Sequence, residues 1–319
     1  MVGSSAALVS FRESHNLLDE LAGLQIQTKH IERVAEDLGK AIAQDEYTRV
    51  EQPSAARETM YLGLDGTGIP MRSEELKDRP GKQSDGSSKT REVKLVTVWT
   101  ADGRDKEGTP VRDEGSISYN AAIESAATTD TDEQVSDFAR RVEREGRRTG
   151  FDNAKRQVII GDGAKWIWNM ADELFPGATQ IVDLYHAKGT VSETAKKIFG
   201  LESAVGERKA KQWRDLLEEG ELDRIIEDLR TFPSCQGAAT CIKYLQTNRK
   251  RMRYPLFRGQ GFCTSSGVVE AGCKVAVGAR LKQAGMHWTL GGANAIIALR
   301  CSKLSGRLDD YWVRRRAAA

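Results

Sequence analysis

Two short apolar segments that each end in an Asp-Gly dipeptide constrain the fold of this chain most strongly. They are "MYLGLDGTG", from residue 60, and "RQVIIGDGA", from residue 156. Each has the length and apolar content of a buried strand, and the Gly-rich end is typical of a turn. Segments with helical character, "DEQVSDFARRVEREGRRTG" and "KWIWNMADELF", flank the second one. Alternating strands and helices predict an α/β fold, a mixed sheet flanked by helices.

Three further segments extend the predicted sheet. "EVKLVTVWT" alternates as a strand, a shorter strand is expected around "SISYNA", and another within "ATQIVDLYH". The expected order is three strands in a meander, a helix, a strand, a helix and a strand, followed by helices over most of 187–247.

The N-terminal part predicts two amphipathic helices within residues 10–45, joined by the turn "GLQIQ". Their expected apolar faces consist of Leu17, Leu18, Leu21 and Leu24 in the first helix and Ile31, Val34, Ala35 and Leu38 in the second. Thr28 is the expected N-cap of the second helix. The pair is similar to a helix-turn-helix that reads DNA. The alternative is a helical hairpin that packs on the main domain or on another protomer.

Charge is distributed unevenly along the chain. The overall net charge is only +2, but from Cys241 to Ala319 there are 15 Lys and Arg against 3 Asp and Glu. The remaining residues hold 33 basic and 43 acidic side chains. Clustered Lys and Arg release counterions from phosphates, so the C-terminal part is expected to meet a polyanion. The alternative is a solvated basic tail ending in Arg314, Arg315 and Arg316.

Other classes are disfavoured by composition. With 39% hydrophobic and 29% charged residues, the chain is in the range of ordinary globular proteins. It lacks a secretory signal pattern at the N-terminus and any long apolar run, so a cytoplasmic protein is expected. Five cysteines without C-x-x-C spacing indicate buried thiols and neither a zinc ribbon nor a disulfide framework.

Asp65 and Asp162 are the first candidate site residues. Each is expected at the end of a strand, followed by Gly, where side chains reach an open crevice. Two carboxylates there can share oxygen-seeking cations such as Mg²⁺. The ordinary alternative is a turn-forming Asp. "LDGTG" also resembles haloacid-dehalogenase phosphatases, but their nucleophilic Asp is replaced by Gly63, which excludes that chemistry.

Glu270 is the third candidate. It aligns with Val277 and Leu281 on one helical face, and a carboxylate in a buried stripe must be paired or metal-bound. The alternative is a surface Glu paired with Lys274. His186 follows Asp183 at the end of a predicted strand, where it can contact phosphate, order a site or cap the next helix.

Four blocks then occur in order: "YLGLDGTGIPMR", "VIIGDGAKWIW", "QIVDLYHAKG" and "GVVEAGCKVAVGARLKQAGMHW". Together they resemble the successive blocks of bacterial insertion-sequence DDE transposases of the ISKra type, which are related in pattern to Mutator-like enzymes. The likeness runs from about residue 10 to about residue 303. Proteins of this type carry more sequence before the helical pair, so a truncated copy is expected.

The resemblance implies an RNase H-like mixed-sheet catalytic core with a helical insertion. The expected divisions are a helical, helix-turn-helix-like segment (1–58), the first part of the core (59–186), the helical insertion (187–262), the Glu-bearing part of the core (263–305) and a basic tail (306–319). The three metal-binding acids of the family map onto Asp65, Asp162 and Glu270. Its Asp/Cys-x-x-His element maps onto Asp183 and His186, which would support the site.

The function that the resemblance implies is DNA cleavage and strand transfer at the ends of an insertion sequence. It requires two Mg²⁺ ions, with Mn²⁺ as the alternative, and double-stranded DNA from terminal repeats and target. A homo-oligomer on DNA, in the bacterial cytoplasm and associated with the nucleoid, is expected. Candidate DNA contacts are Arg280, Lys282, His287 and Trp288, although Trp288 also suits a core. Two alternatives stay open: a nuclease that cuts without joining, and a DNA-binding remnant or repressor without catalysis.

Overall fold

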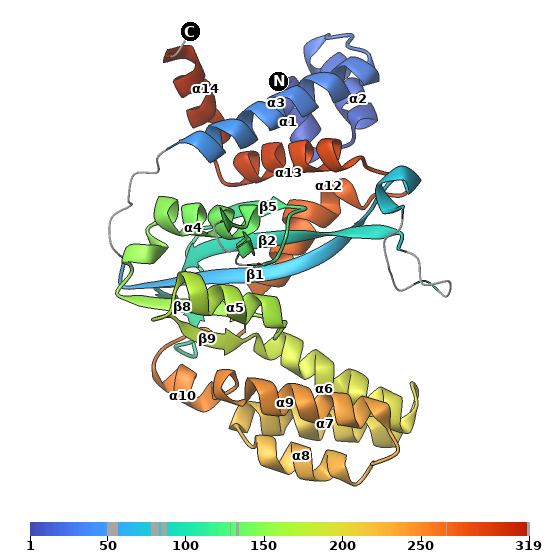
Figure 1. Cartoon of the computed structure of the whole chain (residues 1–319), viewed down its shortest axis with the longest axis vertical. Coiled ribbons are helices and arrows are strands. Elements are labelled where there is room, and N and C mark those ends of the chain that lie inside the picture. Colours follow the sequence, from blue (N-terminus) through green and yellow to red (C-terminus); the bar gives the residue numbers. More distant parts are fainter. Residues whose placement is uncertain are drawn as a thin grey trace.

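The computed structural model describes residues 1–49, 57–77, 83, 88–127, 129–131, 134–265 and 267–317, without the side chains of residues 130, 131, 269 and 270. A five-stranded sheet lies at its centre, between two groups of helices (Figure 1). The strands of this sheet are β1 (Thr59–Pro70), β2 (Thr90–Thr100), β5 (Ser118–Ala122), β8 (Arg156–Gly161) and β9 (Thr179–Val182). Two short pairs, β3 (Gly103–Arg104) with β4 (Pro110–Val111) and β6 (Thr129–Thr131) with β7 (Gln134–Val135), lie outside it.

The helices fall into three groups along the chain. Before the sheet come α1 (Val2–Leu8), α2 (Phe11–Ala22) and α3 (Thr28–Thr48). Within the sheet region lie η1 (Ser73–Leu76), α4 (Asp137–Thr149), η2 (Phe151–Asn153) and α5 (Lys165–Leu174). After β9 come α6 (Leu184–Phe199), α7 (Ala204–Glu219), α8 (Leu222–Arg230), α9 (Gln236–Asn248), η3 (Arg249–Arg251), α10 (Tyr254–Gly259), α11 (Gly267–Gly272), the π-helix η4 (Cys273–Gly278), α12 (Ala279–Leu281), α13 (Leu290–Leu304) and α14 (Leu308–Ala317).

The central sheet is mixed, with strand order β5-β2-β1-β8-β9. β2 is antiparallel to both β1 and β5, whereas β8 is parallel to β1 and β9 is parallel to β8. The predicted α/β class and the order of strands and helices are therefore confirmed. The arrangement is compatible with an RNase H-like core.

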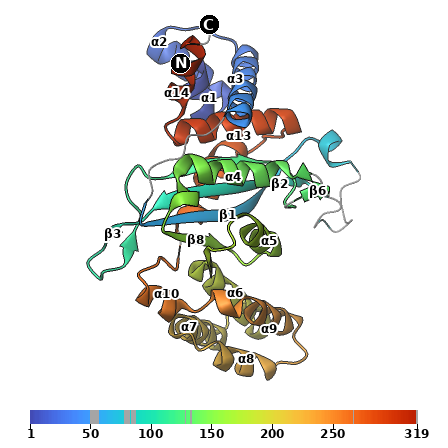
Figure 2. The same cartoon turned by 60° about the vertical axis from the view of Figure 1, so that its left-hand side comes forward.

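Hydrophobic clusters connect the sheet to helices on both sides. One cluster joins Leu62, Val98 and Ile160 to α4, α5 and the α6–α10 layer. The other joins Val93 and Leu95 to α1–α3, η4 and α13. Figures 1 and 2 show α1–α3, α13 and α14 on one side of the sheet and α6–α10 on the other. Among the described helices, none is both long and apolar enough to cross a bilayer.

The N-terminal helices are packed on the core. α3 buries Ile31, Ala35 and Leu38 in the cluster it shares with α13. A Cβ atom at Gly39 would overlap the backbone of Ala295, so glycine is what permits this close helix contact. The packing agrees with the helical-hairpin alternative; DNA contact by these helices stays a prediction.

Several local details differ from the expectations for this segment. Helix α1 was not anticipated, and Gln27, not Thr28, occupies the N-cap position of α3. Leu21 is 81% exposed, so the predicted buried stripe of α2 is wrong there. Gly23 ends α2 with φ 64°, a left-handed conformation that glycine adopts without strain.

Two of the expected domain divisions can be compared with the observed helices. Residue 187 falls inside α6, which runs without interruption from Leu184 to Phe199. The expected basic tail contains a folded helix, α14, because Leu308 and Tyr311 are buried against the core. The Nη2 atom of Arg314 also lies 2.7 Å from the Oδ2 atom of Asp45 on α3.

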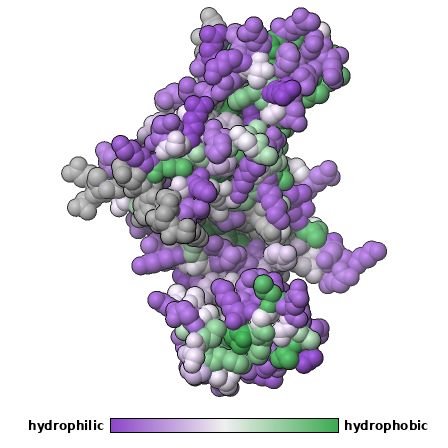
Figure 3. Space-filling model, turned by 90° about the vertical axis from the view of Figure 1, so that its right-hand side faces the viewer, coloured by the Kyte–Doolittle hydropathy of each residue, from purple (hydrophilic) through white to green (hydrophobic). Residues whose placement is uncertain are grey.

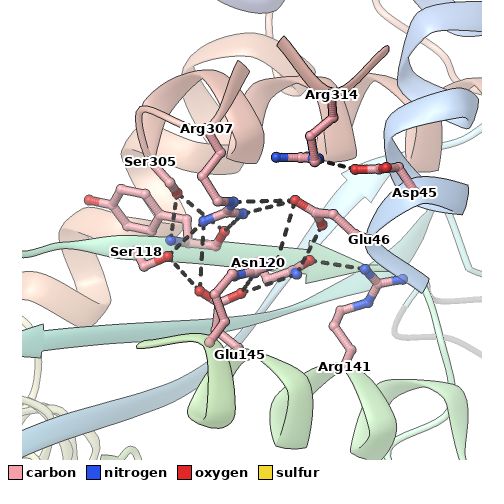
Figure 4. Close-up of polar contacts among 11 residues, drawn as sticks. Asp45, Glu46, Ser118, Asn120, Arg141, Glu145, Ser305, Arg307 and Arg314 are labelled. Carbon is pink, nitrogen blue, oxygen red and sulfur yellow. Dashed lines mark hydrogen bonds and ion pairs between the residues drawn. The ribbon is translucent and has the colours of Figure 1, made fainter. Parts of the chain in front are cut away.

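A buried ionic network, absent from the sequence-based expectations, ties α3, α4 and β5 to the residues before α14 (Figure 4). Its centre is Glu145, which is fully buried and contacts Arg307 and Arg148. Arg307 also pairs with Glu46 of α3, with 3.2 Å between Nη2 and Oε1. Because buried charges require partners, this network holds the N- and C-terminal parts against β5.

Candidate active site

Asp65 lies at the point where β1 loses one of its two neighbours. Pairing of β1 with β8 ends at Leu64 and Gly161, whereas pairing with β2 continues to Pro70. The expectation that Asp65 ends its strand is therefore wrong in detail, because β2 supports β1 for five further residues. The open side of β1 at this point is what exposes the Asp65 carboxylate to a cavity.

Asp162 directly follows β8 and lies beside Asp65. Since Leu64 pairs with Gly161 in parallel register, the next residues of the two strands are Asp65 and Asp162. Asp162 Oδ1 accepts a hydrogen bond from Ala164 N at 2.8 Å, and its carbonyl oxygen accepts one from the Tyr244 hydroxyl at 3.1 Å. These bonds hold the turn so that Asp162 faces the same cavity as Asp65.

The pKa of Asp65 depends on the groups around it. Burial raises the pKa of Asp65, and the nearby charge of Asp162 raises it further. Hydrogen bonds from the Cys273 thiol and the Gly66 N–H, and the charge of His186, act in the opposite direction. Burial, followed by the charge of Asp65, raises the pKa of Cys273, so this thiol stays protonated and donates to the carboxylate.

Asp183 and His186 begin α6 at the adjacent strand end. Asp183 is the N-cap residue: its Oδ1 accepts from Tyr185 N at 2.8 Å and from His186 N at 3.2 Å. Its own backbone N–H donates to Gly161 O at 2.8 Å, which links β9 to β8 just before Asp162. Asp183 is buried and orders the backbone, whereas His186 is exposed and faces the cavity.

A cavity of about 870 Å³ lies in front of these residues. Its sheet side is formed by Asp65, Gly161, Asp162 and Asp183, and the rest by α6 and α9 (Tyr185, His186, Gly189, Thr190, Glu193, Thr194, Lys197, Gln236, Gly237, Thr240, Cys241 and Tyr244). Figure 3 shows a waist between the α6–α9 layer at the bottom and the rest of the molecule. The cavity can therefore admit a ligand that passes between two layers of the structure.

Glu270 belongs to α11, but its side chain lies outside the described residues. The backbone of α11 packs closely on β2, since a Cβ atom at Gly272 would lie 2.9 Å from Leu95 Cδ2. The same helix continues into η4, where Cys273 reaches Asp65. Among the described side chains, no three His, Cys, Asp or Glu residues form a metal-binding group.

The four residues predicted to contact DNA divide into two pairs. Arg280 and Trp288 are buried, which does not suit a surface contact by Arg280 and agrees with the core alternative for Trp288. The Arg280 guanidinium carbon lies 4.6 Å from the Phe11 ring centre and 5.3 Å from that of Trp288, and its Nε donates to Ala6 O. Arg280 therefore joins α1 and α2 to the core.

Lys282 and His287 are exposed, as a phosphate contact requires. Lys282 Nζ donates to Thr67 Oγ1, two residues beyond Asp65 on β1. The Nδ1 atom of His287 lies 3.3 Å from the carbonyl oxygen of Met71. Both residues thus lie along the continuation of β1 past the cavity.

Three residues at the site were not anticipated from the sequence. Cys273 bonds to Asp65, Tyr244 closes the Asp162 turn, and Tyr185 presents a ring that is 65% exposed beside His186. The position of Tyr185 between Asp183 and His186 in "DLYH" was a usable signal for that residue. Nothing in the local sequence distinguishes Tyr244 or Cys273 from ordinary core residues.

Comparison with known proteins gives a similarity to a solved structure. No protein-family model matches the sequence, and neither does any curated protein. The chain is similar to the solved Drosophila P element transposase strand transfer complex with a TM-score of 0.32 and 11% sequence identity. That alignment covers 97% of this chain and 79% of the other.

Proposed function

We propose that this chain is a metal-dependent polynucleotidyl transferase of the DDE type that cleaves DNA and joins the cut ends. The observation that carries this proposal is the parallel register of β1 and β8, which brings Asp65 and Asp162 together in one cavity. The ordered blocks that resemble ISKra-type transposases support the same reading and extend it to insertion-sequence ends.

The donor set suits divalent cations such as Mg²⁺. Burial and the charge of Asp162 both disfavour ionised Asp65, and a cation held between the two carboxylates relieves that cost. Glu270 is the proposed third ligand. Residues three apart in a helix share a face, so position 270 lies on the face of Cys273, which contacts Asp65.

When bound, such ions lower the pKa of an attacking hydroxyl and offset charge on the departing oxygen. The residues of the chain bind and orient the DNA. His186, exposed at the cavity, can donate a hydrogen bond to a phosphate oxygen, and Asp183 holds its backbone in place. Lys282, beyond Asp65, can pair with the next phosphate. Tyr185 offers a ring on which an unpaired base can stack.

The test uses purified protein, Mg²⁺ and a plasmid with the repeats that flank the gene. Asp65→Asn and Asp162→Asn should each reduce cleavage at the repeat ends by at least about 100-fold, because each removes a metal ligand. Asp37→Asn is the matched control, since Asp37 is 68% exposed and lies on α3, on the other side of the sheet. Cleavage that survives in either variant would refute the assignment.

A second readout does not depend on activity. Mn²⁺ should raise the melting temperature of the wild-type protein by mass action, and it should do so less for Asp65→Asn and Glu270→Gln. Products in which labelled repeat ends become joined to a second DNA would distinguish the transferase from a nuclease. DNA binding without cleavage in any variant would favour a repressor.

A further inference from the structure

A second cavity, of about 500 Å³, lies where α9 meets η3 and α10, and its charged lining residues are all positive. It is lined by Ala178, Thr179, Gln180, Gln246, Thr247, Arg249, Lys250, Arg251, Arg253 and Phe257. Four of these side chains are cationic and none is a carboxylate. We define this set as the η3 pocket.

Two of the three arginines in the η3 pocket, Arg251 and Arg253, are oriented by hydrogen bonds from their Nε atoms. Arg251 Nε donates to Gln180 Oε1 at 2.6 Å, and its guanidinium carbon lies 4.7 Å from the Trp168 ring centre. Arg253 Nε donates to Lys250 O at 3.2 Å. Orientation through Nε leaves the terminal nitrogens of both guanidinium groups available for a ligand.

Nearby acids offset only part of this positive charge. Asp223 forms two bonds with Arg249, and Asp172 accepts a hydrogen bond from Gln180. For Lys250 and Arg253, the described residues provide no ion pair with a carboxylate. Guanidinium groups oriented around a hollow, half-buried at Arg251 and exposed at Arg253, are suited to phosphate, which accepts two parallel hydrogen bonds from one arginine.

Helix α9 connects the η3 pocket to the candidate active site. Its residue Tyr244 donates a hydrogen bond to the carbonyl oxygen of Asp162, and its last turn, at Gln246 and Thr247, lines the η3 pocket. Strand β9 spans the same interval, from Gln180 in the pocket to the residue before Asp183, and three residues of strand extend about 10 Å. One DNA strand advances about 3.4 Å per phosphate along the helix axis, which makes this separation about three nucleotides.

We propose that the η3 pocket is a clamp for the DNA backbone, holding a phosphate about three nucleotides from the one in the candidate active site. The number of nucleotides between this phosphate and the cleaved bond rests on the proposed function. The anion site itself is inferred from the residues of the η3 pocket alone. The recognised group is a phosphate, and the chosen source is the DNA backbone and not a free phosphate.

The first experiment measures how the affinity for a fluorescein-labelled DNA duplex depends on salt. Lys250→Ala/Arg253→Ala should reduce the slope of log affinity against log salt by about 2, because two phosphate contacts are lost. The control is Lys155→Ala/Lys211→Ala, which removes two lysines that are 72% and 75% exposed and each paired with a carboxylate. A slope unchanged in the pocket variant, or reduced equally in the control, would overturn the clamp.

The second experiment tests the register and the source of the phosphate. A neutral methylphosphonate placed about three nucleotides from the cleaved bond should weaken binding to the wild type but not to the pocket variant. A uniform effect at all positions would refute the register. Inorganic phosphate that binds the wild type but not the variant, without displacing DNA at equal ionic strength, would assign the pocket to free phosphate and overturn the clamp.

The clamp and the proposed function can fail separately. Cleavage that requires Asp65, together with an unchanged salt slope in the pocket variant, would keep the function and reject the clamp. A reduced slope without any cleavage by the wild type would keep the anion site and reject the proposed chemistry.

Arg251→Lys, which keeps the charge but loses the planar guanidinium, should lower the affinity for DNA less than Lys250→Ala/Arg253→Ala does.

Discussion

Replacement of Glu145 by Gln is expected to destabilise the protein strongly at neutral pH. Glu145 is fully buried and contacts Arg148, Arg307, Ser118 and Asn120 (Figure 4). The neutral amide leaves Arg148 and Arg307 without that carboxylate, and its NH₂ group meets other donors. Removing one partner of a buried ionic cluster costs about 3–5 kcal/mol.

The pKa of Glu145 gives a second measure of the same effect. Although burial alone would raise it, the charges of Arg148 and Arg307 and the bonds from Ser118 and Asn120 lower the pKa of Glu145 from 4.5 to about 2. That difference corresponds to about 3 kcal/mol of stabilisation of the ionised form in the folded state. This value agrees with the cost of removing one partner of a buried ionic cluster. If the free energy of unfolding falls by about 3 kcal/mol per molar urea, both values predict a fall of about 1 M in the urea midpoint of Glu145→Gln.

The dependence on pH distinguishes charge from shape. Because the folded pKa is lowered, this stabilisation is complete above the ordinary value of 4.5 and is lost as pH falls through about 2. Urea denaturation followed by circular dichroism should therefore show the gap between wild type and Glu145→Gln closing over that range. Equal midpoints at neutral pH, or a gap that stays constant with pH, would refute the reasoning.

A control on the same helix separates burial from charge. Glu143 is 50% exposed and pairs with Arg147 across one helical turn at 3.2 Å. Glu143→Gln should change the free energy of unfolding by no more than about 0.5 kcal/mol, since solvent screens this pair. A control as damaging as Glu145→Gln would mean that helix α4 tolerates no change at either position.

Three further predictions concern single residues. Gly163 has φ 100°, and a Cβ there would lie 2.6 Å from Tyr244 Cε2. Gly163→Ala should therefore lower the free energy of unfolding by about 2 kcal/mol, measured by urea denaturation, and an unchanged midpoint would contradict this. Arg280→Ala should lower the free energy of unfolding by about 3 kcal/mol, because the ring contacts and the bond to Ala6 are lost. The dependence of DNA affinity on salt should stay unchanged because the group is buried, and a reduced slope would show that Arg280 contacts DNA. Tyr185→Ala should weaken binding to DNA with unpaired bases by about 1–3 kcal/mol, whereas Tyr185→Phe, which keeps the exposed ring, should not. Equal affinities of the wild type and Tyr185→Ala in fluorescence anisotropy would exclude stacking.

The order of elements was predictable from the sequence because strand and helix periodicities report local burial. Strands at "MYLGLDGTG" and "RQVIIGDGA", and the helices that flank the second strand, are present as expected. Asp65 and Asp162 were selected by the glycines that follow them, and both face the cavity. A residue that must reach a ligand leaves such a local signal, because it requires a turn or an open strand edge.

Other features depended on packing between segments that are distant in the chain. The side-by-side placement of Asp65 and Asp162 follows from the β1–β8 register, which no local pattern specifies. The same is true of the Cys273 contact with Asp65 and of the η3 pocket, which combines β9 with η3 and α10.

Arg280 illustrates the physical reason for this division. By type it belongs at the surface, yet α1 and α2 cover it and supply a carbonyl oxygen and an aromatic ring. The amino-acid sequence determined which faces were apolar and which residues could carry charge chemistry. Only the tertiary structure decided which segment covers each face, because burial and charge pairing are properties of two surfaces in contact.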